Sequence, residues 1–342
     1  MTIGIDVGYG HVKWTTDGEH VSTFPSVVSS ADFSEEEELF AQTDGMSDLA
    51  LSWNGRRFMV GERALREDVQ ATRMLAATRT TGDEFKTLFA TVMLMGEGEG
   101  RVVTGLPYTA IKDQREQVKR TLEQGLGKAV GLAGAIKACT WDGKISSISL
   151  FKQAQAMLFD AIFENRRGAL VPVRDEILLE VPGTRAAIVD VGYKTTDVIV
   201  CEMLPEFRVI QELSFTIPLA VSAVGTRIQR AFQRMSGEDT LDARRLEFVI
   251  AGQKIANFGQ VLDLSEERNR AVKEIGVQMR NQILEKWGKA LMNISVVYLG
   301  GGGAELFAQG FVNQLHQNVT KIKNPQGANA RGYFKMDALL SP

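Results

Sequence analysis

The chain contains the motif Asp-Val-Gly-Tyr twice, each time between two apolar runs. The first copy lies in IGIDVGYGHVKW at residues 3–14, and the second lies in AAIVDVGYKTTDVIV at residues 186–200. The residues that follow each glycine turn are mostly β-branched or apolar, so each turn is predicted to close a β-hairpin instead of opening a helix. A motif that returns in the same setting predicts two related α/β halves.

Strand and helix patterns alternate around both copies. Strands are predicted at residues 3–7, 12–16, 20–24, 101–107, 186–191, 196–203 and 207–213, and in ISVVYL before four glycines. Turns are predicted at Asp17-Gly18, Asn54-Gly55, Asp142-Gly143, 192–195 and 204–206, and IKACTWDGKISSISLF is predicted to form two strands joined by Asp142-Gly143. Helices are predicted at 83–95, 109–126, 152–168 and 265–293, and after the four glycines.

The repeat divides the chain into two expected lobes. The first comprises residues 1–166, with a small outer subdomain at about 25–82, and is completed by the C-terminal residues 324–342. The second comprises residues 167–323. The segment at 168–184 contains Pro172, Pro182 and Gly183, and is expected to be a flexible crossing or a loop that faces a partner.

Composition excludes several classes of protein. The 342 residues carry a net charge of −3, whereas a domain that binds bare DNA phosphates needs a basic surface. No apolar run approaches the length of a membrane span, and the first residues lack the pattern of a secretory signal, so a cytoplasmic protein is expected. Cys139 and Cys201 lie in β-like apolar contexts and are expected to be reduced thiols, and no zinc-site spacing is present.

An aspartate next to a glycine turn has two uses in phosphate chemistry. Glycines let backbone N–H groups approach a phosphate closely, and an aspartate at the end of a buried strand can hold a hydrated Mg²⁺. A Rossmann or Walker loop would lead into a helix, and the spacing GxxxxGK[ST] is absent. Two hairpin turns of this kind predict two loops that bind one phosphate chain from opposite sides.

Three motifs of the chain resemble the nucleotide-binding loops of a known family. IDVGYGHVK resembles the first phosphate loop of the actin, Hsp70 and sugar-kinase ATPase superfamily, VDVGYKTTD its second phosphate loop, and VVYLGGGGAELF its adenosine loop. With the compact length and the terminal ANARGY, the chain most resembles the ParM/StbA plasmid-segregation actins and their archaeal relatives. The resemblance implies an α/β fold of two duplicated actin-like (ribonuclease H-like) lobes. Each lobe would be a mixed sheet with an N-terminal β-meander and flanking helices, with a nucleotide cleft between them.

The resemblance also implies roles for the motif residues. Asp6 and Asp190 would face the Mg²⁺ of bound ATP or GTP, mainly through water. The first phosphate loop would be Gly8, Tyr9, Gly10, His11 and Lys13, the second Gly192, Tyr193, Lys194, Thr195 and Thr196, and the nucleoside would pack on Gly300, Gly301, Gly302 and Gly303. Lys13 would reach the phosphates as a point charge, or would be an exposed strand lysine. Asn329 in ANARGY is expected to be structural.

Relatives carry Glu or Gln at the start of the helix between the halves, where it positions the attacking water. KQAQAMLF supplies Gln153, directly after a strand, with Gln155 as the alternative. A glutamine orients water without acting as a strong base, which implies slow hydrolysis. One segment departs from the resemblance, because FTIPLAVSAVG lacks the hinge glycines of relatives until Gly225.

The implied function is an ATPase or GTPase that polymerises head to tail into dynamic filaments. Plasmid DNA would be reached through a DNA-binding adaptor protein, with neither direct DNA binding nor a membrane. The alternative is a non-polymerising small-molecule kinase of the sugar-kinase type, which would need a catalytic aspartate and a sugar pocket for which no motif is evident. The sequence does not discriminate ATP from GTP, and it gives neither the filament geometry nor the cargo.

Overall fold

The structure is a computed structural model. It describes residues 2–340 except for 31–44, 72, 74, 76–79, 97–99, 109, 125, 167–168, 173–180, 204–206, 238–239 and 313. The predicted turn at 204–206 and most of the segment at 168–184 therefore lie outside the described residues. The chain divides into two compact units. Unit 1 comprises Met1–Asp160, Asn165–Leu170 and Asn329–Pro342, and unit 2 comprises Ala161–Glu164 and Val171–Ala328.

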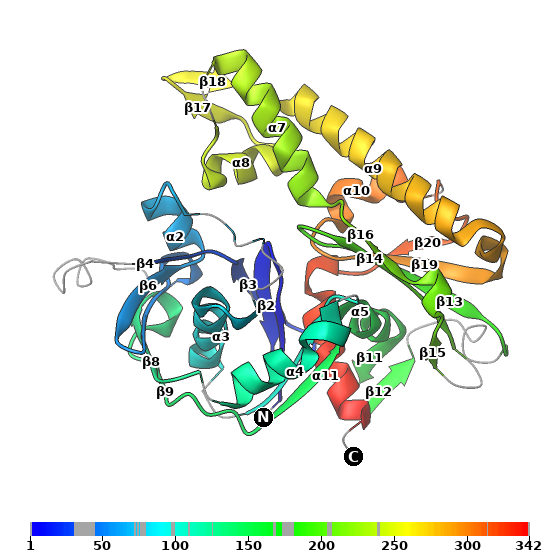
Figure 1. Cartoon of the computed structure of the whole chain (residues 1–342), viewed down its shortest axis with the longest axis horizontal. Coiled ribbons are helices and arrows are strands. Elements are labelled where there is room, and N and C mark those ends of the chain that lie inside the picture. The colour runs from blue at the N-terminus through cyan, green and yellow to red at the C-terminus, as the bar shows by residue number, and fades with distance from the viewer. Residues whose placement is uncertain are drawn as a thin grey trace. The chain divides into compact units, whose positions relative to one another are not determined.

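Unit 1 is built on a mixed five-stranded sheet in the order β10-β7-β1-β2-β3 (Figure 1). Its strands are β1 (Thr2–Val7), β2 (His11–Thr15), β3 (Ser22–Pro25), β7 (Arg101–Leu106) and β10 (Ser147–Lys152). The first three strands form an antiparallel meander, and β7 and β10 run parallel to β1. The predicted N-terminal meander is therefore confirmed.

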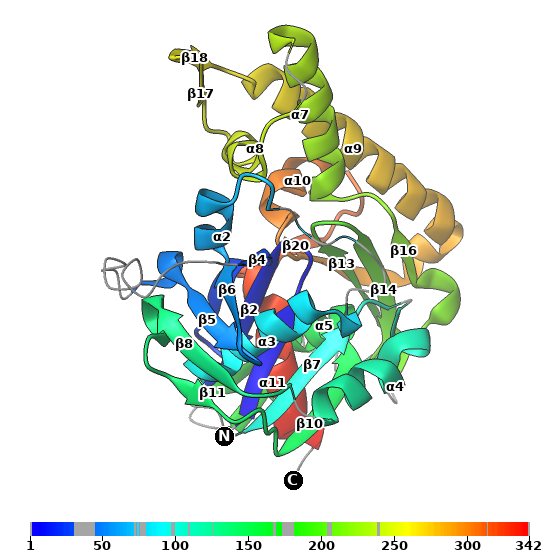
Figure 2. The same ribbon diagram turned by 60° about the vertical axis from the view of Figure 1, so that its left-hand side comes forward.

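Helices pack on both faces of this sheet, because successive strand residues point to opposite sides. Val102 of β7 joins a core with Phe89 and Met93 of α3 (Asp83–Met95). Val103 packs instead with Ala156 of α5 (Gln153–Ile162) and with Tyr333 of α11 (Ala328–Leu340). The helix α4 (Ala110–Glu123) contacts β7 and β10, which lie side by side in Figure 2.

A second five-stranded sheet in unit 1 has the order β4-β6-β5-β8-β9. Its elements are β4 (Val28–Ser30), β5 (Ala50–Trp53), β6 (Arg56–Val60), β8 (Ala129–Ala133) and β9 (Thr140–Trp141), with α2 (Glu62–Glu67) after β6 and short 3-10 turns η1 (Met46–Asp48) and η3 (Gly134–Ile136). The predicted turn at Asn54-Gly55 joins β5 to β6. Strands β8 and β9 come from outside residues 25–82, so this sheet is discontinuous in sequence.

Two predictions between residues 136 and 168 are wrong. The Asp142-Gly143 turn does not close a hairpin, because β9 pairs with β8 whereas β10 pairs with β7 in the other sheet. The predicted helix at 152–168 ends at Ile162 and is followed by the strands β11 (Phe163–Arg166) and β12 (Ala169–Pro172). The first error arises because pairing with distant strands overrides the local pattern, whereas in the second β11 and β12 pair with each other.

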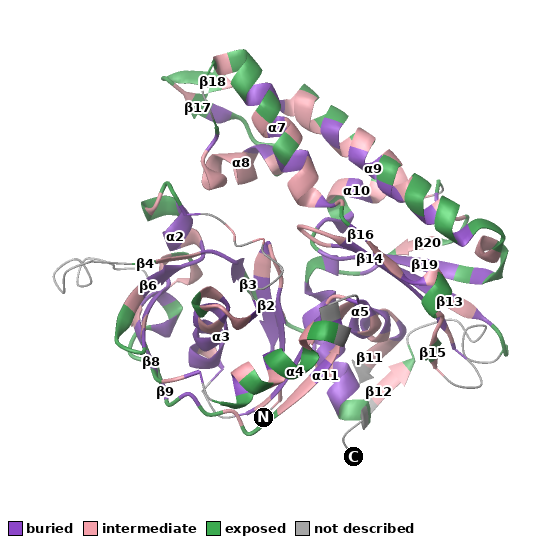
Figure 3. Cartoon of the chain, in the orientation of Figure 1, coloured by how far each residue is buried: buried purple, intermediate pink, exposed green. Residues whose placement is uncertain are grey.

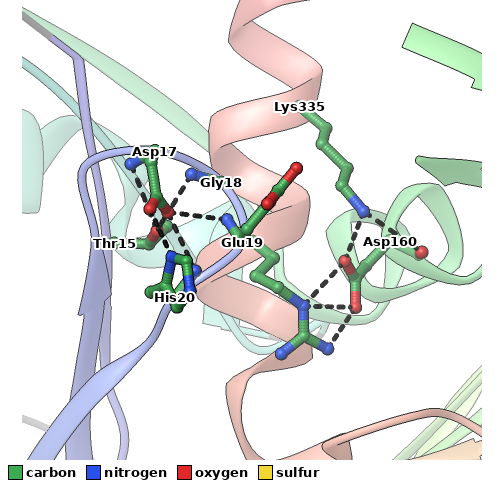
Figure 4. A network of polar contacts seen from close by, with 8 residues as sticks. Thr15, Asp17, Gly18, Glu19, His20, Asp160 and Lys335 are labelled. Atoms are coloured by element: carbon green, nitrogen blue, oxygen red, sulfur yellow. Dashed lines mark hydrogen bonds and ion pairs between the residues drawn. The ribbon is translucent and has the colours of Figure 1, made fainter. Parts of the chain in front are cut away.

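The hairpin turn at Asp17-Gly18 is held by side chains. Asp17 Oδ1 accepts hydrogen bonds from the backbone N–H groups of Glu19 and His20, each at 2.8 Å, and from Thr15 Oγ1 at 3.0 Å (Figure 4). Gly18 has φ +76°, a conformation that glycine adopts readily. The exposed His20 ring bonds the same aspartate, and this bond raises the pKa of His20.

A buried ionic cluster joins α5 to α11 within unit 1. The Asp160 carboxylate accepts hydrogen bonds from Arg331 Nε at 3.0 Å, from Arg331 Nη2 at 2.6 Å and from Lys335 Nζ at 2.7 Å (Figure 4). The two helices approach closely, because a Cβ at Gly332 would overlap the carbonyl of Ala156. The C-terminal helix is therefore fixed to the helix that begins with Gln153.

Unit 2 repeats the first sheet. Its order is β15-β14-β13-β19-β20, with β16 also paired to β14. The strands are β13 (Arg185–Val191), β14 (Thr196–Glu202), β15 (Arg208–Val209), β16 (Phe215–Ile217), β19 (Ile294–Gly300) and β20 (Val319–Lys321). Both central sheets are largely buried in Figure 3. The predicted third strand at 207–213 is wrong in its extent, because the 3-10 turn η4 (Gln211–Leu213) separates β15 from β16.

The helices of unit 2 pack on this sheet around a single apolar core, which includes Ile228, Ile275 and Phe307. They are α7 (Val221–Ser236), α8 (Ala243–Ile250), α9 (Ser265–Trp287) and α10 (Ala304–Phe311), with the hairpin β17 (Ile255–Asn257) and β18 (Gln260–Leu262) between α8 and α9. The short 3-10 turn η6 (Pro325–Gly327) precedes α11. The helix predicted at 265–293 ends at Trp287, because Gly288 has φ +48° and the 3-10 turn η5 (Gly288–Asn293) follows.

Candidate functional site

The Asp6 carboxylate, at the end of β1, brings two predicted site residues together. Lys13 Nζ donates to Asp6 Oδ2 at 3.0 Å, and Gln153 Nε2 donates to Asp6 Oδ1 at 3.0 Å. Lys13 faces Asp6 because the two residues are in register on β1 and β2. Gln153 is the first residue of α5. Lys13 and Asp6 are buried, so the reading of Lys13 as an exposed strand lysine is wrong.

The first glycine turn is narrow. The Gly8 N–H donates to the His11 carbonyl at 3.1 Å. A Cβ at Gly8 would lie 2.8 Å from the Lys13 Nζ and 3.9 Å from Asp6 Oδ2. Any side chain there would therefore fill the space beside the Asp6–Lys13 pair, which a glycine leaves open.

Two residues that sequence reasoning missed hold this loop. Ser26 Oγ donates to the Gly8 carbonyl at 2.7 Å, the Ser26 N–H donates to the Gly10 carbonyl at 2.9 Å, and Arg73 Nε donates to the same Gly10 carbonyl at 3.1 Å. Because the loop carbonyls accept these bonds, the loop keeps one shape. No motif marks Ser26 or Arg73, which lie in the irregular part of the sequence after β3.

The His11 side chain lies at the start of β2. Burial lowers the pKa of His11 to about 3, and the positive charges of Lys13 and Arg73 act in the same direction. The imidazole is therefore neutral at physiological pH and adds no charge to the loop. The positive charge next to this loop comes from Lys13 and Arg73.

The second glycine turn repeats the first. The Gly192 N–H donates to the Thr195 carbonyl at 2.9 Å, between β13 and β14, as Gly8 does to His11. Buried Asp190 occupies the position on β13 that Asp6 occupies on β1. The cross-strand neighbour differs, since Asp190 faces Asp197 where Asp6 faces Lys13. Thr196 is buried and its Oγ1 donates to the Leu219 carbonyl at 2.8 Å, so this hydroxyl has a structural partner.

The segment without hinge glycines packs on the second turn. The Ser222 N–H, in the first turn of α7, donates to the Tyr193 carbonyl at 2.7 Å. A Cβ at Gly303 would lie 2.9 Å from the Val221 side chain. The segment therefore fixes the second turn from the α7 side.

The four glycines lie against Asp190. Gly300 is in register with Asp190 on the paired strand β19, and a Cβ at Gly301 would overlap Asp190 Oδ1. The Gly303 N–H donates to the Val191 carbonyl at 2.8 Å. A cavity of about 640 Å³ lies between α9 and α10, the helix that begins directly after the four glycines. It is lined by residues that include Arg268, Lys273, Glu305 and Leu306. Glycine is needed here because the chain passes directly beside the aspartate.

The predicted site residues thus form two sets. Asp6, Gly8, Tyr9, Gly10, His11, Lys13 and Gln153 lie together in unit 1, and Asp190, Gly192, Tyr193, Lys194, Thr195, Thr196 and Gly300 to Gly303 lie together in unit 2. Over the described ranges, no group of three or more His, Cys, Asp or Glu side chains could hold a metal ion. In the same ranges, no helix is long and apolar enough to cross a membrane.

Two related sheets that each open with an aspartate and a glycine hairpin define an actin-like fold. Two segments of the chain are similar to actin-like proteins: residues 4–131 match a family model described as the N-terminal domain of actin-like proteins, and residues 188–313 match one described as archaeal actin homologue MreB-like, C-terminal. No curated protein matches the sequence.

Solved structures with the same fold span nearly the whole chain. A 15-stranded ParM filament from Clostridium botulinum aligns with a TM-score of 0.82 at 23% identity, over 98% of this chain and 99% of that chain. An archaeal actin homologue in complex with ADP aligns with a TM-score of 0.75 at 18% identity, over 97% of each chain. Bacillus thuringiensis ParM with ATP aligns with a TM-score of 0.69 at 15% identity, over 99% and 98%.

Proposed function

We propose that this protein is an actin-like nucleoside triphosphatase that binds Mg²⁺ with ATP or GTP and polymerises into dynamic filaments. The observation that carries the proposal is the position of the Asp6 carboxylate between Lys13 Nζ and Gln153 Nε2, beside a glycine turn that unit 2 repeats next to Asp190. A cation, an amide and a narrow glycine turn around one carboxylate suit phosphoryl chemistry.

The residues present fit a hydrated Mg²⁺ with a triphosphate. Gly8 leaves open the space beside the Asp6–Lys13 pair that a Cβ would fill, and Gly301 lets the backbone pass directly beside the Asp190 carboxylate. Asp6 and Asp190 would hold Mg²⁺ mainly through water, and Mg²⁺ when bound neutralises charge on the phosphate oxygens. Lys13 would contribute a point charge to the phosphates, and the two glycine turns would contribute backbone donors. Gly300 to Gly303 would pack against the nucleoside.

Gln153 would orient the attacking water. Its amide can accept one hydrogen bond from a water and donate another, but its neutral side chain is a weak base. Its Nε2 already donates to Asp6, which fixes the direction of the side chain. Hydrolysis would therefore be slow, as a timer for filament turnover requires.

Solved structures of the same fold support the proposal that this chain assembles into filaments. One of the solved structures of this fold is a ParM filament, and another is the nucleotide complex of a ParM. A head-to-tail contact does not close on itself and so extends into a filament. We propose plasmid or other DNA segregation through a DNA-binding adaptor protein, since a net charge of −3 disfavours direct binding to DNA phosphates.

Light scattering, pelleting and phosphate release test this function together. With Mg²⁺ and ATP or GTP, the wild-type chain should scatter and pellet reversibly while it releases phosphate slowly. The variant D190A should lose hydrolysis. A chain that stays in the supernatant with both nucleotides, and whose turnover rises with an added sugar, would instead be a small-molecule kinase.

A further inference from the structure

Three carbonyl groups of the first glycine turn accept hydrogen bonds. The Gly10 carbonyl accepts two, from the Ser26 N–H at 2.9 Å and from Arg73 Nε at 3.1 Å. The Gly8 carbonyl accepts one from Ser26 Oγ at 2.7 Å, and the His11 carbonyl accepts one from the Gly8 N–H at 3.1 Å. A carbonyl oxygen has two lone pairs, so both lone pairs of the Gly10 oxygen are used.

These bonds also fix where the N–H groups of the turn point. In a planar trans peptide unit, the C=O of one residue and the N–H of the next residue point in opposite directions. The Gly8 C=O points to Ser26 Oγ, so the Tyr9 N–H points away from Ser26. The Gly10 C=O points to Ser26 and Arg73, so the His11 N–H points away from both. The turn therefore directs N–H groups to the side opposite these two residues.

Ser26 and Arg73 lie on the two connections between the central sheet of unit 1 and its second sheet. Ser26 directly follows β3 of the central sheet and is only 4% exposed. The carbonyl of its neighbour Val27 accepts a hydrogen bond at 2.9 Å from the N–H of Gly61, which directly follows β6 of the second sheet. Arg73 lies on the return path, between α2 and α3. The Ser26 segment is therefore held by both sheets and keeps the turn in one orientation.

The second glycine turn has a similar arrangement with different donors. The Tyr193 carbonyl accepts a hydrogen bond from the Ser222 N–H at 2.7 Å, and the Val191 carbonyl accepts one from the Gly303 N–H at 2.8 Å. Backbone groups thus hold these carbonyls in unit 2, whereas two of the donors in unit 1 are side chains. A substitution can remove a side-chain donor but not a backbone donor, so the arrangement can be tested at the first turn.

We infer that Ser26 and Arg73 are positioning residues that aim the N–H groups of the first glycine turn at the phosphates of the nucleotide. This inference rests on the proposed function, and it adds two residues to the site. A carbonyl oxygen directed at a phosphate would repel it, whereas the N–H end of the peptide dipole attracts it. A turn that is held in this orientation needs little ordering when it binds, which raises its affinity for the nucleotide.

The variants S26A and R73Q each remove one of these side-chain donors. The N–H groups of the turn would bind the phosphates before the reaction as well as during it. Misdirecting them should therefore raise the KM for the nucleotide about tenfold or more and change kcat little. R73K keeps a charged donor and should recover most of this loss. Phosphate release is measured at protein concentrations too low for pelleting.

Two matched controls remove the same kinds of side chain nearby. Ser29 lies three residues after Ser26, and its hydroxyl donates to Asp68. Arg66 of α2 pairs with Asp48 and Glu67. The variants S29A and R66Q should therefore keep the KM of the wild type.

Equilibrium binding of a non-hydrolysable ATP or GTP analogue with Mg²⁺ separates positioning from a merely structural role. S26A and R73Q should bind the analogue about tenfold more weakly or worse. A merely structural role would lower the melting temperature and leave the affinity of the folded protein unchanged. Arg73 is half-buried, so R73Q carries the test if S26A does not fold.

Wild-type affinity and KM in folded R73Q, or a lower kcat at unchanged KM, would overturn the inference and leave the proposed function standing. A wild-type chain that binds neither analogue would overturn both.

Discussion

Gln153 Nε2 donates a hydrogen bond to Asp6 Oδ1 at 3.0 Å, so the first residue of α5 is bonded to the C-terminal end of strand β1. Gln155 has a partly exposed side chain two residues further along the same helix. Residues two apart on a helix point in different directions. The bond to Asp6 therefore selects Gln153 as the residue that would orient water.

Replacement of Gln153 by alanine should lower the rate of phosphate release by about 10- to 100-fold, because loss of a positioned proton-transfer or water-orienting group has effects of this order or larger. Nucleotide affinity should change little, and filaments should last longer. Q155A is the matched control and should hydrolyse nucleotide like the wild type. A larger loss in Q155A than in Q153A would reassign the role.

The pH dependence of stability should report the neutral state of the half-buried His11 side chain. Burial lowers its pKa from 6.5 to about 3, so the unfolded chain takes up a proton below pH 6.5 that the folded chain does not. Above pH 6.5 His11 therefore does not change the free energy of unfolding. As the pH falls from 6.5 to 3, His11 lowers the free energy of unfolding by up to about 1.4 kcal/mol for each pH unit.

Urea unfolding at pH 7 and pH 5 checks this effect. H11Q should lose about 2 kcal/mol less than the wild type between these two pH values, from the same slope over the 1.5 units below pH 6.5. Equal losses in the two proteins would show that His11 titrates normally in the folded chain.

The ionic cluster around Asp160 should dominate the attachment of α11. D160N keeps the shape of the side chain but removes the charge that Arg331 and Lys335 both bind. Breaking a buried ion pair costs about 3–5 kcal/mol, whereas an exposed pair contributes about 0–1 kcal/mol. Denaturant unfolding should therefore separate D160N from D263N, whose exposed carboxylate pairs with Lys254. Equal stabilities of the two variants would contradict the role of the cluster.

Because α5 and α11 cross closely, an alanine substitution should destabilise the protein at Gly332 of α11 but not at Gly310 of α10, which lies outside the crossing. G332A places a methyl group on the Ala156 carbonyl and should destabilise unit 1 severely. G310A in α10 meets only an ordinary contact at 3.9 Å, so it should be neutral or stabilise by up to about 1 kcal/mol from helix propensity. Thermal unfolding of both variants checks the pair, and a tolerated G332A would show that the helices can separate without cost.

Much of the fold was predictable because its signals are local. The hairpin after Asp6, its repeat after Asp190 and the turn at Asn54-Gly55 follow from glycine positions and alternating apolar residues. The helix at 83–95 was predicted with its boundaries, since its apolar spacing is regular and glycines flank it. Long periodic segments carry enough information to be recognised singly.

The errors lie where distant segments decide the outcome. Nothing local in ACTWDGKISSISLF indicates that β9 pairs with β8 and β10 with β7. The cluster of Asp160 with Arg331 and Lys335 joins residues that are 171 and 175 positions apart, and Arg73 reaches Gly10 from an irregular region. The partner of Lys13, by contrast, is local: the register of the β1–β2 hairpin places Lys13 opposite Asp6.

The central proposal is that the hairpins at Asp6 and Asp190 bind one triphosphate with its metal. A crystal grown with a non-hydrolysable ATP analogue and Mn²⁺ tests it most directly, because anomalous scattering locates the metal. We predict one Mn²⁺ peak about 4–5 Å from both carboxylates, the separation that one bridging water gives. A metal and nucleotide bound at only one of the two aspartates, or at neither, would contradict the proposal.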